Sequence, residues 1–274
     1  MTPLIDSHVH VWDPAVNEYR WLSGELARPY LPDEYRAGAP QTTGVIFVEA
    51  EAGDNLSEAH WVASLDWPEL LGIVAQAPLE RGAAVADPLE RLRGSDRVVG
   101  IRRQLQDEPI SFFDHPGLLA GLRVLAKTGL PFDACVRHSQ LPALTALLAQ
   151  VPELPVVLDH LGKPPVAWGD DGTWARELRA LAALPQVRVK LSGLAPEGSP
   201  DRPVRDQARE WLLTGLDAFG PERCMLGSDW PVSAISAPRE TPGEWLDHVL
   251  SDAGASDGDR DWLSWRTASA FYGV

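Results

Sequence analysis

Near its start the chain reads Leu4-Ile5-Asp6-Ser7-His8-Val9-His10-Val11-Trp12. Apolar residues dominate this run, which is typical of a short buried strand. His8 and His10 stand two positions apart, so both imidazoles project from the same face of the strand and can converge on one point. Two neutral imidazoles held in this way can ligate zinc or a similar divalent metal, or donate hydrogen bonds to an oxyanion. The alternative is a chance pair of histidines without a shared role. The position of this strand in the fold helps to decide between the two.

Seven further apolar runs follow, and their starts are about 31 residues apart on average. With the first run, they lie at residues 4–11, 43–50, 71–77, 98–103, 131–136, 155–160, 187–192 and 223–229. Between most of them lie segments with apolar residues at three- and four-residue spacing, which is typical of amphipathic helices. These helical segments include residues 116–128, 139–150, 173–184 and 204–219. The alternation predicts an α/β fold with a parallel sheet, and eight such units predict a single (β/α)8 TIM barrel.

The length of the chain fits one barrel of this kind, which takes about 250 residues. We therefore expect residues 1–274 to form one domain, with the helical segment 258–272 following as a tail. The segments after the strands are longer than the turns before them. These long strand-to-helix segments are residues 12–42, 161–172, 193–203 and 230–243. Because barrel active sites lie at the carboxyl ends of the strands, these loops indicate the working face.

The composition excludes several classes of function. The formal charge of -15 repels phosphate backbones and anionic lipid, so we expect no nucleic-acid or membrane partner. No apolar run approaches the roughly 18 residues of a membrane helix, and residues 1–6 leave no room for a signal peptide. Cys135 and Cys224 stand in apolar runs, as buried thiols do. We expect an ordinary globular protein of the cytoplasm, with a homodimer left open.

Two other strand ends carry polar residues that interrupt apolar runs. The sixth run ends on His160, and the eighth ends on Asp229 in Gly227-Ser228-Asp229-Trp230-Pro231. A carboxylate at the mouth of a barrel can bind a metal, take a proton from water, or do both in turn. A polar group that only satisfies the backbone is the alternative for each residue alone. Their joint placement with His8 and His10 predicts one catalytic site made of His8, His10, His160 and Asp229.

This arrangement resembles the amidohydrolase superfamily, whose members carry His-x-His on the first barrel strand and an aspartate at the end of the eighth. Further blocks are similar to its amidohydrolase-2 branch of sugar-acid lactonases, which act on fuconate- and rhamnonate-type lactones and on 2-pyrone-4,6-dicarboxylate. The blocks are Gly100-Ile101-Arg102, Leu130-Pro131-Phe132-Asp133, Leu158-Asp159-His160-Leu161-Gly162-Lys163-Pro164, Lys190-Leu191-Ser192-Gly193-Leu194 and residues 227–231. The resemblance spans essentially the whole chain and implies a hydrolase of carbohydrate metabolism that acts on ester bonds.

The chain departs from the superfamily's full metal pattern, which adds a carboxylated lysine on strand four or a histidine on strand five. Here strand four presents Arg102 and Arg103. His138 lies just beyond strand five and is either a substitute ligand or an ordinary loop residue. We therefore expect at most one divalent metal, Zn²⁺ or Mn²⁺, on His8, His10 and Asp229, or a metal-free site.

Cationic and flat side chains near the predicted mouth are candidates for substrate binding. Arg102, Lys163 and Lys190 can bind a carboxylate or a lactone oxygen, whereas Arg103 points the opposite way from Arg102 on a regular strand. Glu49 can receive substrate hydroxyls. Trp12, Trp21, Trp168 and Trp230 lie in or beside the long loops. Tryptophan rings stack on apolar faces of sugars, although packing is an equal alternative for each. We select Trp12 and Trp230 as candidate contacts.

These residues predict hydrolysis of a lactone ring in a small sugar acid or related carboxylic acid. Asp229 takes a proton from water, and His8, His10, His160 or a metal stabilises the oxyanion. No Gly-x-Ser-x-Gly elbow suggests a serine nucleophile. The alternative from another reaction class is non-oxidative decarboxylation of an aromatic or unsaturated acid, which requires a firmly bound metal. A barrel that only binds a ligand is a third hypothesis, which the four predicted catalytic residues disfavour.

Overall fold

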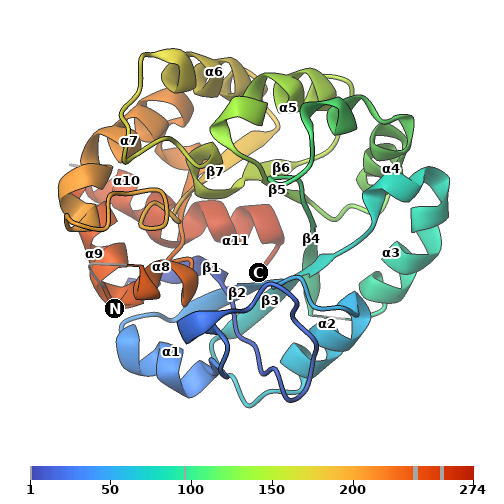
Figure 1. Cartoon of the computed structure of the whole chain (residues 1–274), viewed down its shortest axis with the longest axis horizontal. Coiled ribbons are helices and arrows are strands. Elements are labelled where there is room, and N and C mark those ends of the chain that lie inside the picture. The colour runs from blue at the N-terminus through green and yellow to red at the C-terminus, as the bar shows by residue number, and fades with distance from the viewer. Residues whose placement is uncertain (1, 96, 237–239, 254–255) are drawn as a thin grey trace.

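The chain folds as one (β/α)8 barrel. A computed structural model describes residues 2–95, 97–236, 240–253 and 256–274. Eight parallel strands follow one another around the sheet in sequence order (Figure 1). The strands are β1 (Ile5–Val9), β2 (Gly44–Val48), β3 (Leu70–Gln76), β4 (Val98–Gln104), β5 (Phe132–Cys135), β6 (Val156–Leu158), β7 (Val187–Leu191) and β8 (Cys224–Leu226). Every predicted apolar run overlaps one of them, so the predicted fold class is confirmed.

The first and last strands close the barrel just beyond the end of β8. The backbone N–H of Asp229 donates to the carbonyl of His8 at 2.8 Å, and that of His10 donates to Trp230 at 2.8 Å. Val9 and Trp230 form a parallel bridge. These bonds bring the histidine pair of β1 beside the aspartate that follows β8, although more than 200 residues separate them in sequence.

Helices surround the strands on the outside, except for the last helix of the chain. They are α1 (Pro32–Gly38), α2 (Asn55–Ala63), α3 (Ala86–Arg93), α4 (Pro116–Ala126), α5 (Leu141–Leu148), α6 (Thr173–Ala182), α7 (Val204–Phe219), α8 (Val232–Ile235), α9 (Pro242–Asp252), α10 (Asp257–Asp261) and α11 (Thr267–Tyr272). The four predicted helical segments correspond to α4, α5, α6 and α7. The predicted loop 12–42 is interrupted by α1, whose Pro32 takes the first helical position. None of the helices in the described ranges is long and apolar enough to cross a bilayer.

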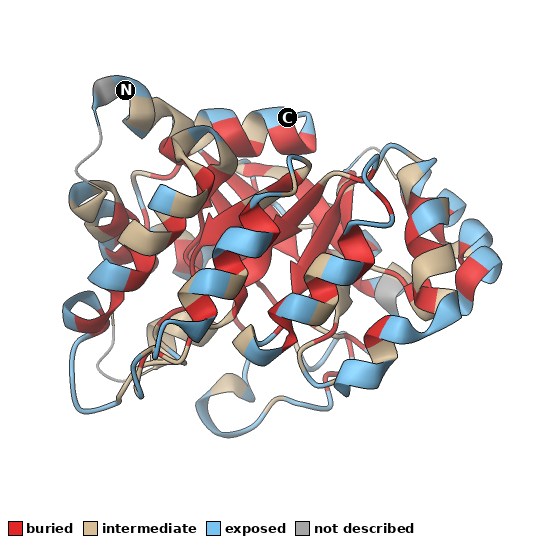
Figure 2. Ribbon diagram, turned by 90° about the horizontal axis from the view of Figure 1, so that it is seen from above, coloured by how far each residue is buried: buried red, intermediate tan, exposed pale blue. Residues whose placement is uncertain are grey.

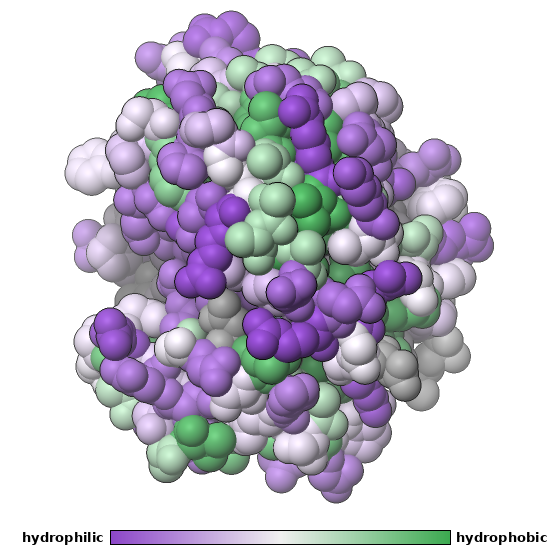
Figure 3. Space-filling model, turned by 90° about the vertical axis from the view of Figure 1, so that its right-hand side faces the viewer, coloured by the Kyte–Doolittle hydropathy of each residue, from purple (hydrophilic) through white to green (hydrophobic). Residues whose placement is uncertain are grey.

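The main core lies between the strands and the surrounding helices. Figure 2 shows the strands buried and the helices buried only on their inner faces. Examples of this core layer are Phe47 on β2, Leu118 and Leu122 on α4, and Leu178 on α6, all fully buried. On the outer face near α3 and α4, hydrophilic residues are interspersed with smaller apolar groups (Figure 3). The buried layer therefore holds the strands in place beneath the loops at their carboxyl ends.

A second core fills the inside of the barrel. Residues from the strands pack there against Ala268, Phe271 and Tyr272 of α11. Figure 1 shows α11 across the middle of the ring of strands, and Figure 2 shows it near the carboxyl terminus at one end of the barrel. The prediction that 258–272 forms a tail is therefore wrong. Its apolar residues face inward because the barrel interior would otherwise contain unfilled space.

Candidate active site

His8 and His10 converge as their spacing predicts. Their Nε2 atoms are 3.2 Å apart, and both side chains are buried. His10 Nδ1 lies 2.7 Å from the carbonyl oxygen of Val48, an acceptor only, so Nδ1 carries the proton. That bond leaves the lone pair of His10 on Nε2, which faces the site. The strand therefore delivers an imidazole of fixed orientation to the mouth of the barrel, with Nε2 toward the site.

Asp229 follows β8 and places one carboxylate oxygen among three imidazoles. Its Oδ1 lies 3.5 Å from Nε2 of His10, 3.7 Å from Nε2 of His160 and 3.8 Å from Nε2 of His8. Its other oxygen, Oδ2, accepts a hydrogen bond from the hydroxyl of Ser233 at 2.7 Å. Oδ1 is therefore the oxygen that faces the reacting groups, and Ser233 fixes the orientation of the carboxylate.

His160 reaches the site through an unusual backbone. It lies in a short turn, η5 (Asp159–Gly162), and has a positive φ of 54°. Its Nδ1 is 2.9 Å from the hydroxyl of Ser192. Gly193 lies against the ring, and a Cβ at that position would overlap His160. The Ser-Gly pair after β7 therefore serves to seat this imidazole.

The protonation states suit hydrolysis. Burial lowers the pKa of His160 to about 4, and burial together with Lys190 lowers the pKa of His8 well below its usual range. Both imidazoles are therefore neutral near pH 7. Burial would raise the pKa of Asp229, but His160 and His10 hold that pKa well below its ordinary value. The site thus contains an ionised carboxylate beside neutral imidazoles.

A buried network of charges supports His8 from inside the barrel. Lys190 Nζ lies 2.5 Å from Asp133 Oδ2, 3.1 Å from Asp159 Oδ1 and 3.1 Å from His8 Nδ1. The hydroxyl of Tyr272, on α11, donates to Asp133 Oδ2 at 2.8 Å. All of these side chains are buried. Helix α11, which packs inside the barrel, is therefore connected to the catalytic face through Lys190.

Arg102 has its own carboxylate partners. Its Nε donates to Glu49 Oε1 at 2.6 Å, and its Nη1 lies 3.6 Å from Asp159 Oδ2. Arg103, next to it, points outward to Glu80 and Glu108, as the strand alternation predicts. The guanidinium of Arg102 lines the site with its charge already compensated.

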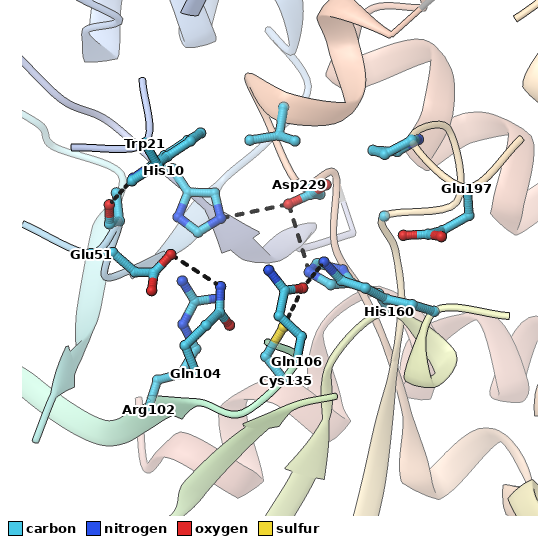
Figure 4. Close-up of a pocket in the computed structure, with 15 residues that line it drawn as sticks. His10, Trp21, Glu51, Arg102, Gln104, Gln106, Cys135, His160, Glu197 and Asp229 are labelled. Carbon is cyan, nitrogen blue, oxygen red and sulfur yellow. Dashed lines mark hydrogen bonds and ion pairs between the residues drawn. The ribbon is translucent and has the colours of Figure 1, made fainter. Parts of the chain in front are cut away.

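A pocket opens over these residues (Figure 4). It has a volume of about 130 Å³ and is open to solvent. Its lining residues are His10, Trp21, Ala50, Glu51, Arg102, Gln104, Gln106, Cys135, His160, Lys163, Gly193, Pro196, Glu197, Asp229 and Val232. The members of this lining that the sequence singled out are His10, Trp21, Arg102, His160, Lys163 and Asp229.

Four predicted substrate contacts lie outside this lining and need a different interpretation. Trp12 is fully buried and donates its indole N–H to the carbonyls of Leu26 and Arg28. Trp230 packs against Tyr35. Glu49 binds Arg102, and Lys190 is the buried cation beneath His8. Each of these four side chains is already engaged in the wall and supports the site there, and a direct contact of any of them with substrate stays a prediction.

Other predicted residues take different places. Trp21 lines the pocket and donates its indole N–H to the carbonyl of Ala50 at 2.7 Å, whereas Trp168 is 91% exposed. His138 Nδ1 lies 3.0 Å from the carbonyl of Lys163 and so supports the loop after β6. It belongs to neither of the candidate metal groups among the described residues. Cys135 and Cys224 are free and buried, as predicted.

The sequence reasoning missed several polar residues of the site. Asp159 precedes His160 and was not assigned a role, although a charged residue in an apolar run was a visible signal. Glu51, Gln104, Gln106 and Glu197 line the pocket but stand in or beside loops with no distinctive spacing. Their contribution depends on how the loops fold, which no local pattern reveals.

The ligand atoms fit one divalent cation. Zinc binds nitrogen and oxygen at about 2.0–2.2 Å in a tetrahedron, so its ligand atoms lie about 3.3 Å apart. The Nε2 atoms of His8 and His10 and Oδ1 of Asp229 are separated by 3.2, 3.5 and 3.8 Å. A second group, made of His8, Asp159 and His160, shares His8 with the first. The predicted ligand set is therefore one that can hold a single metal ion.

A parallel (β/α)8 barrel with one histidine on β1 and another directly after it, a histidine after β6 and an aspartate after β8 defines the class of amidohydrolase-type barrel enzymes. The chain belongs to the amidohydrolase family, whose family model matches residues 5–274. The family predicted from the sequence is thus confirmed.

Similar proteins cover the whole fold. An L-fucono-1,5-lactonase of Burkholderia multivorans is 35% identical, over 91% of this chain and 90% of that one. An L-fucono-1,5-lactonase of Burkholderia ambifaria is 32% identical, over 90% and 86%. The crystal structure of an amidohydrolase from Burkholderia multivorans with bound zinc has a TM-score of 0.88 at 33% identity, with 99% of each chain covered. A 2,6-dihydroxybenzoate decarboxylase from Rhizobium shares the fold at 14% identity, with a TM-score of 0.67 and coverage of 100% and 99%.

Proposed function

We propose that this protein is a hydrolase that opens the lactone ring of a small sugar acid or related carboxylic acid. The observation that carries the proposal is Asp229 Oδ1, an ionised oxygen that faces three imidazole Nε2 atoms beside the pocket. Ring opening by water requires a base for the water and donors for the oxyanion, and this arrangement offers both. The two lactonases that are 35% and 32% identical over most of the chain support this reaction class.

Asp229 acts as the general base in the proposed reaction. Oδ1 takes a proton from water, and the water oxygen bonds to the lactone carbonyl carbon. When the ring C–O bond breaks, Asp229 returns the proton to the ring oxygen, which leaves as a hydroxyl. A low pKa makes the carboxylate a weaker base but keeps it in the basic form at every physiological pH. The hydroxyl of Ser233 holds Oδ2, so the same oxygen gives and takes the proton.

The imidazoles orient the reactants, and those of His8 and His160 stabilise negative charge. His160 receives a fixed orientation from Ser192, and His10 from the carbonyl of Val48. When a divalent metal is bound, His8, His10 and Asp229 hold it, and it supplies a Lewis acid for the carbonyl and lowers the pKa of bound water. Lys163 adds positive charge at the wall on which the carbonyl oxygen lies in the proposed complex.

Decarboxylation is the alternative with less support. It requires a metal that chelates the substrate. The pocket side of this site instead presents Arg102, whose charge is compensated by Glu49, and β5 carries no histidine that could serve as a further metal ligand. The decarboxylase from Rhizobium is similar to this chain in fold alone. The lactonase proposal therefore explains more of the site.

A pH-indicator assay of the purified protein tests the proposal. The panel contains aldono-1,4-lactones, aldono-1,5-lactones and lactones that carry a free carboxylate, with and without added Zn²⁺ or Mn²⁺. We expect release of acid from at least one lactone well above its spontaneous hydrolysis. Absence of turnover for every lactone, together with release of carbon dioxide from an aromatic acid, would overturn the proposal in favour of the decarboxylase.

The assembly, the location and the domain boundaries stay predictions. A homodimer is tested by size-exclusion chromatography with light scattering, and the cytoplasmic location by cell fractionation. Limited proteolysis that leaves residues 1–274 intact would support one domain.

A further inference from the structure

The charged side chains of the pocket wall influence which substrates can bind. Arg102 is the most deeply buried cation of the lining, at 3% exposure. Glu49 and Asp159 both lie within ion-pair distance of it, at 2.6 and 3.6 Å. One guanidinium thus faces two carboxylates, so it has little net charge left for an anionic substrate. The cation that the sequence favours for anion binding is already neutralised.

Lys163 is the other cation of the lining. It follows η5 with a positive φ of 50°, and its ammonium donates to Oε1 of Gln106 across the pocket wall. A single ammonium of this kind can hold one carbonyl or hydroxyl oxygen. The lactone carbonyl itself requires such a donor during ring opening, so Lys163 does not supply a second, separate carboxylate site.

Two carboxylates of the lining are not paired with a cation in the described part of the chain. They are the carboxylates of Glu51 and Glu197. Glu51 lies after β2 with a positive φ of 58°, a conformation that is strained for a residue other than glycine. Its backbone N–H donates to Glu49 Oε2 at 2.7 Å, and Gln104 Nε2 approaches its carboxylate at 3.5 Å. The strained backbone therefore holds this carboxylate toward the pocket.

Glu197 lies on the other side of the pocket. Figure 4 shows Glu51 and Glu197 at opposite sides of the opening, with Asp229 between them. The carbonyl of Glu197 accepts a hydrogen bond from the backbone N–H of Ala167 at 2.9 Å, which ties the loop after β7 to the loop after β6. Carboxylates accept hydrogen bonds from hydroxyl groups and repel other carboxylates.

From this geometry we propose that Glu51 and Glu197 select uncharged, hydroxyl-rich lactones and exclude lactones that carry a free carboxylate. The inference rests on the proposed lactonase function and names its substrate class. Each glutamate accepts hydrogen bonds from hydroxyls of the bound ring or its side chain, while Lys163 and the imidazoles are left for the carbonyl. We call the opening of the pocket, where Glu51 and Glu197 lie on opposite sides, the rim. Because these two glutamates act on the substrate at the rim, they are specificity residues, whereas Asp229 is the base.

A matched pair of substrates tests this selection. The pair is the aldono-1,4-lactone that the protein hydrolyses fastest and its aldaro counterpart, in which a carboxylate replaces the terminal CH2OH. We expect kcat/KM to favour the uncharged member by tenfold or more, and the preference to shrink as salt is added, because ions screen the repulsion. A preference for the carboxylate-bearing lactone, or turnover of such lactones alone, overturns the inference while the lactonase function stands. Failure to hydrolyse any lactone refutes the proposed function instead.

Two variants assign the selection to residues. Glu51→Gln and Glu197→Gln keep the shape and remove the charge, so each should change the ratio of kcat/KM values about tenfold in favour of the carboxylate-bearing lactone. For the uncharged lactone, the change should be mainly in KM. Glu153→Gln, an exposed residue in the turn before β6, is the matched control and should leave the ratio unchanged. An unchanged ratio in both rim variants, with thermal unfolding like that of the parent protein, overturns the assignment.

Discussion

Unusual backbone conformations gather at the pocket. Among the described residues, five that are not glycine have positive φ values of 50–58°, namely Glu51, His160, Leu161, Lys163 and Asp229. All except Leu161 line the pocket. Such conformations cost roughly 1–3 kcal/mol each and persist where surrounding structure enforces them. The strain is therefore concentrated at the residues to which we assign chemistry and selection.

Asp229→Asn tests the base at this scale. The amide keeps the shape and the contact with Ser233 but cannot accept the proton of water. We expect kcat on the best lactone to fall by about 10²–10⁴-fold, the range of general acid–base catalysis. Circular dichroism should show an intact fold. Asp87→Asn on the exposed side of α3 is the control and should retain full activity. A variant of Asp229 that retained most of its kcat would remove this residue from the base role.

Glu58, on α2, makes stability depend on pH. Burial, and then the neighbouring carboxylate of Glu49, raises the pKa of Glu58 from its ordinary 4.5 to about 8. The folded protein therefore binds a proton that the unfolded chain has released, so this residue's contribution to stability is lost as pH rises from 4.5 through 8. Glu58→Gln keeps an acceptor for the backbone N–H of Ala50 without the titrating charge.

Urea denaturation at a series of pH values measures this effect. We expect the unfolding free energy of Glu58→Gln, minus that of the parent protein, to grow by up to about 1.4 kcal/mol per pH unit across that window. Glu90→Gln on exposed helix surface should show a flat difference. A flat difference for Glu58→Gln as well would mean that the carboxylate is already ionised in the folded protein.

At the scale of elements, the sequence predicted what depends on local apolar pattern. The eight strands and the helices α4 to α7 are predicted correctly because each of them buries one or both of its faces in an apolar core. The spacing of apolar residues along the sequence reflects that burial. The turn η5 was not predicted, because a positive φ at His160 leaves no trace in an apolar pattern. The place of α11 inside the barrel was missed for a different reason. Its amphipathic pattern is the same whether it covers the outside or plugs the inside.

The contact between α11 and the charge network gives a prediction for that element. Tyr272→Phe removes the hydrogen bond to Asp133 and leaves the carboxylate with Lys190 as its partner. A hydrogen bond to a charged group contributes about 1.5–3 kcal/mol, so we expect the unfolding free energy in urea to fall by that amount.

The control for this variant is Tyr30→Phe, which removes a bond from its hydroxyl to the neutral carbonyl of Glu25. That change should cost only about 0.5–1.5 kcal/mol. An equal loss in the two variants would show that the charge of Asp133 has no special weight. Because Lys190 also lies 3.1 Å from His8, we expect Tyr272→Phe to lower kcat as well, whereas Tyr30→Phe should not.

At the scale of the whole molecule, the site brings together residues that are distant in sequence. The candidate catalytic residues come from β1, from η5 and from the end of β8, and closure of the barrel makes them neighbours. The sequence predicted these four because each stands at a strand end. It could not predict the glutamates of the rim or the compensation of Arg102, since both depend on which loops and strands become adjacent.

The last prediction concerns the metal. It applies to the whole molecule because it distinguishes metal binding from folding of the chain. His8, His10 and Asp229 offer three ligand atoms with spacings that suit one cation. A second cation is opposed by positive charge, since Arg102 and Lys190 both lie beside Asp159, the remaining carboxylate of the cluster. The fold itself rests on two apolar cores and not on these ligands.

We therefore expect elemental analysis after gentle purification to find at most one divalent metal per chain, and a chelator to remove it while circular dichroism stays unchanged. If the cation activates water, the stripped protein loses activity and regains it with Zn²⁺ or Mn²⁺. If the imidazoles alone stabilise the oxyanion, chelation leaves kcat nearly constant. Two tightly held metals per chain, or unfolding on chelation, would contradict the prediction, because either result requires ligands beyond the three that converge here.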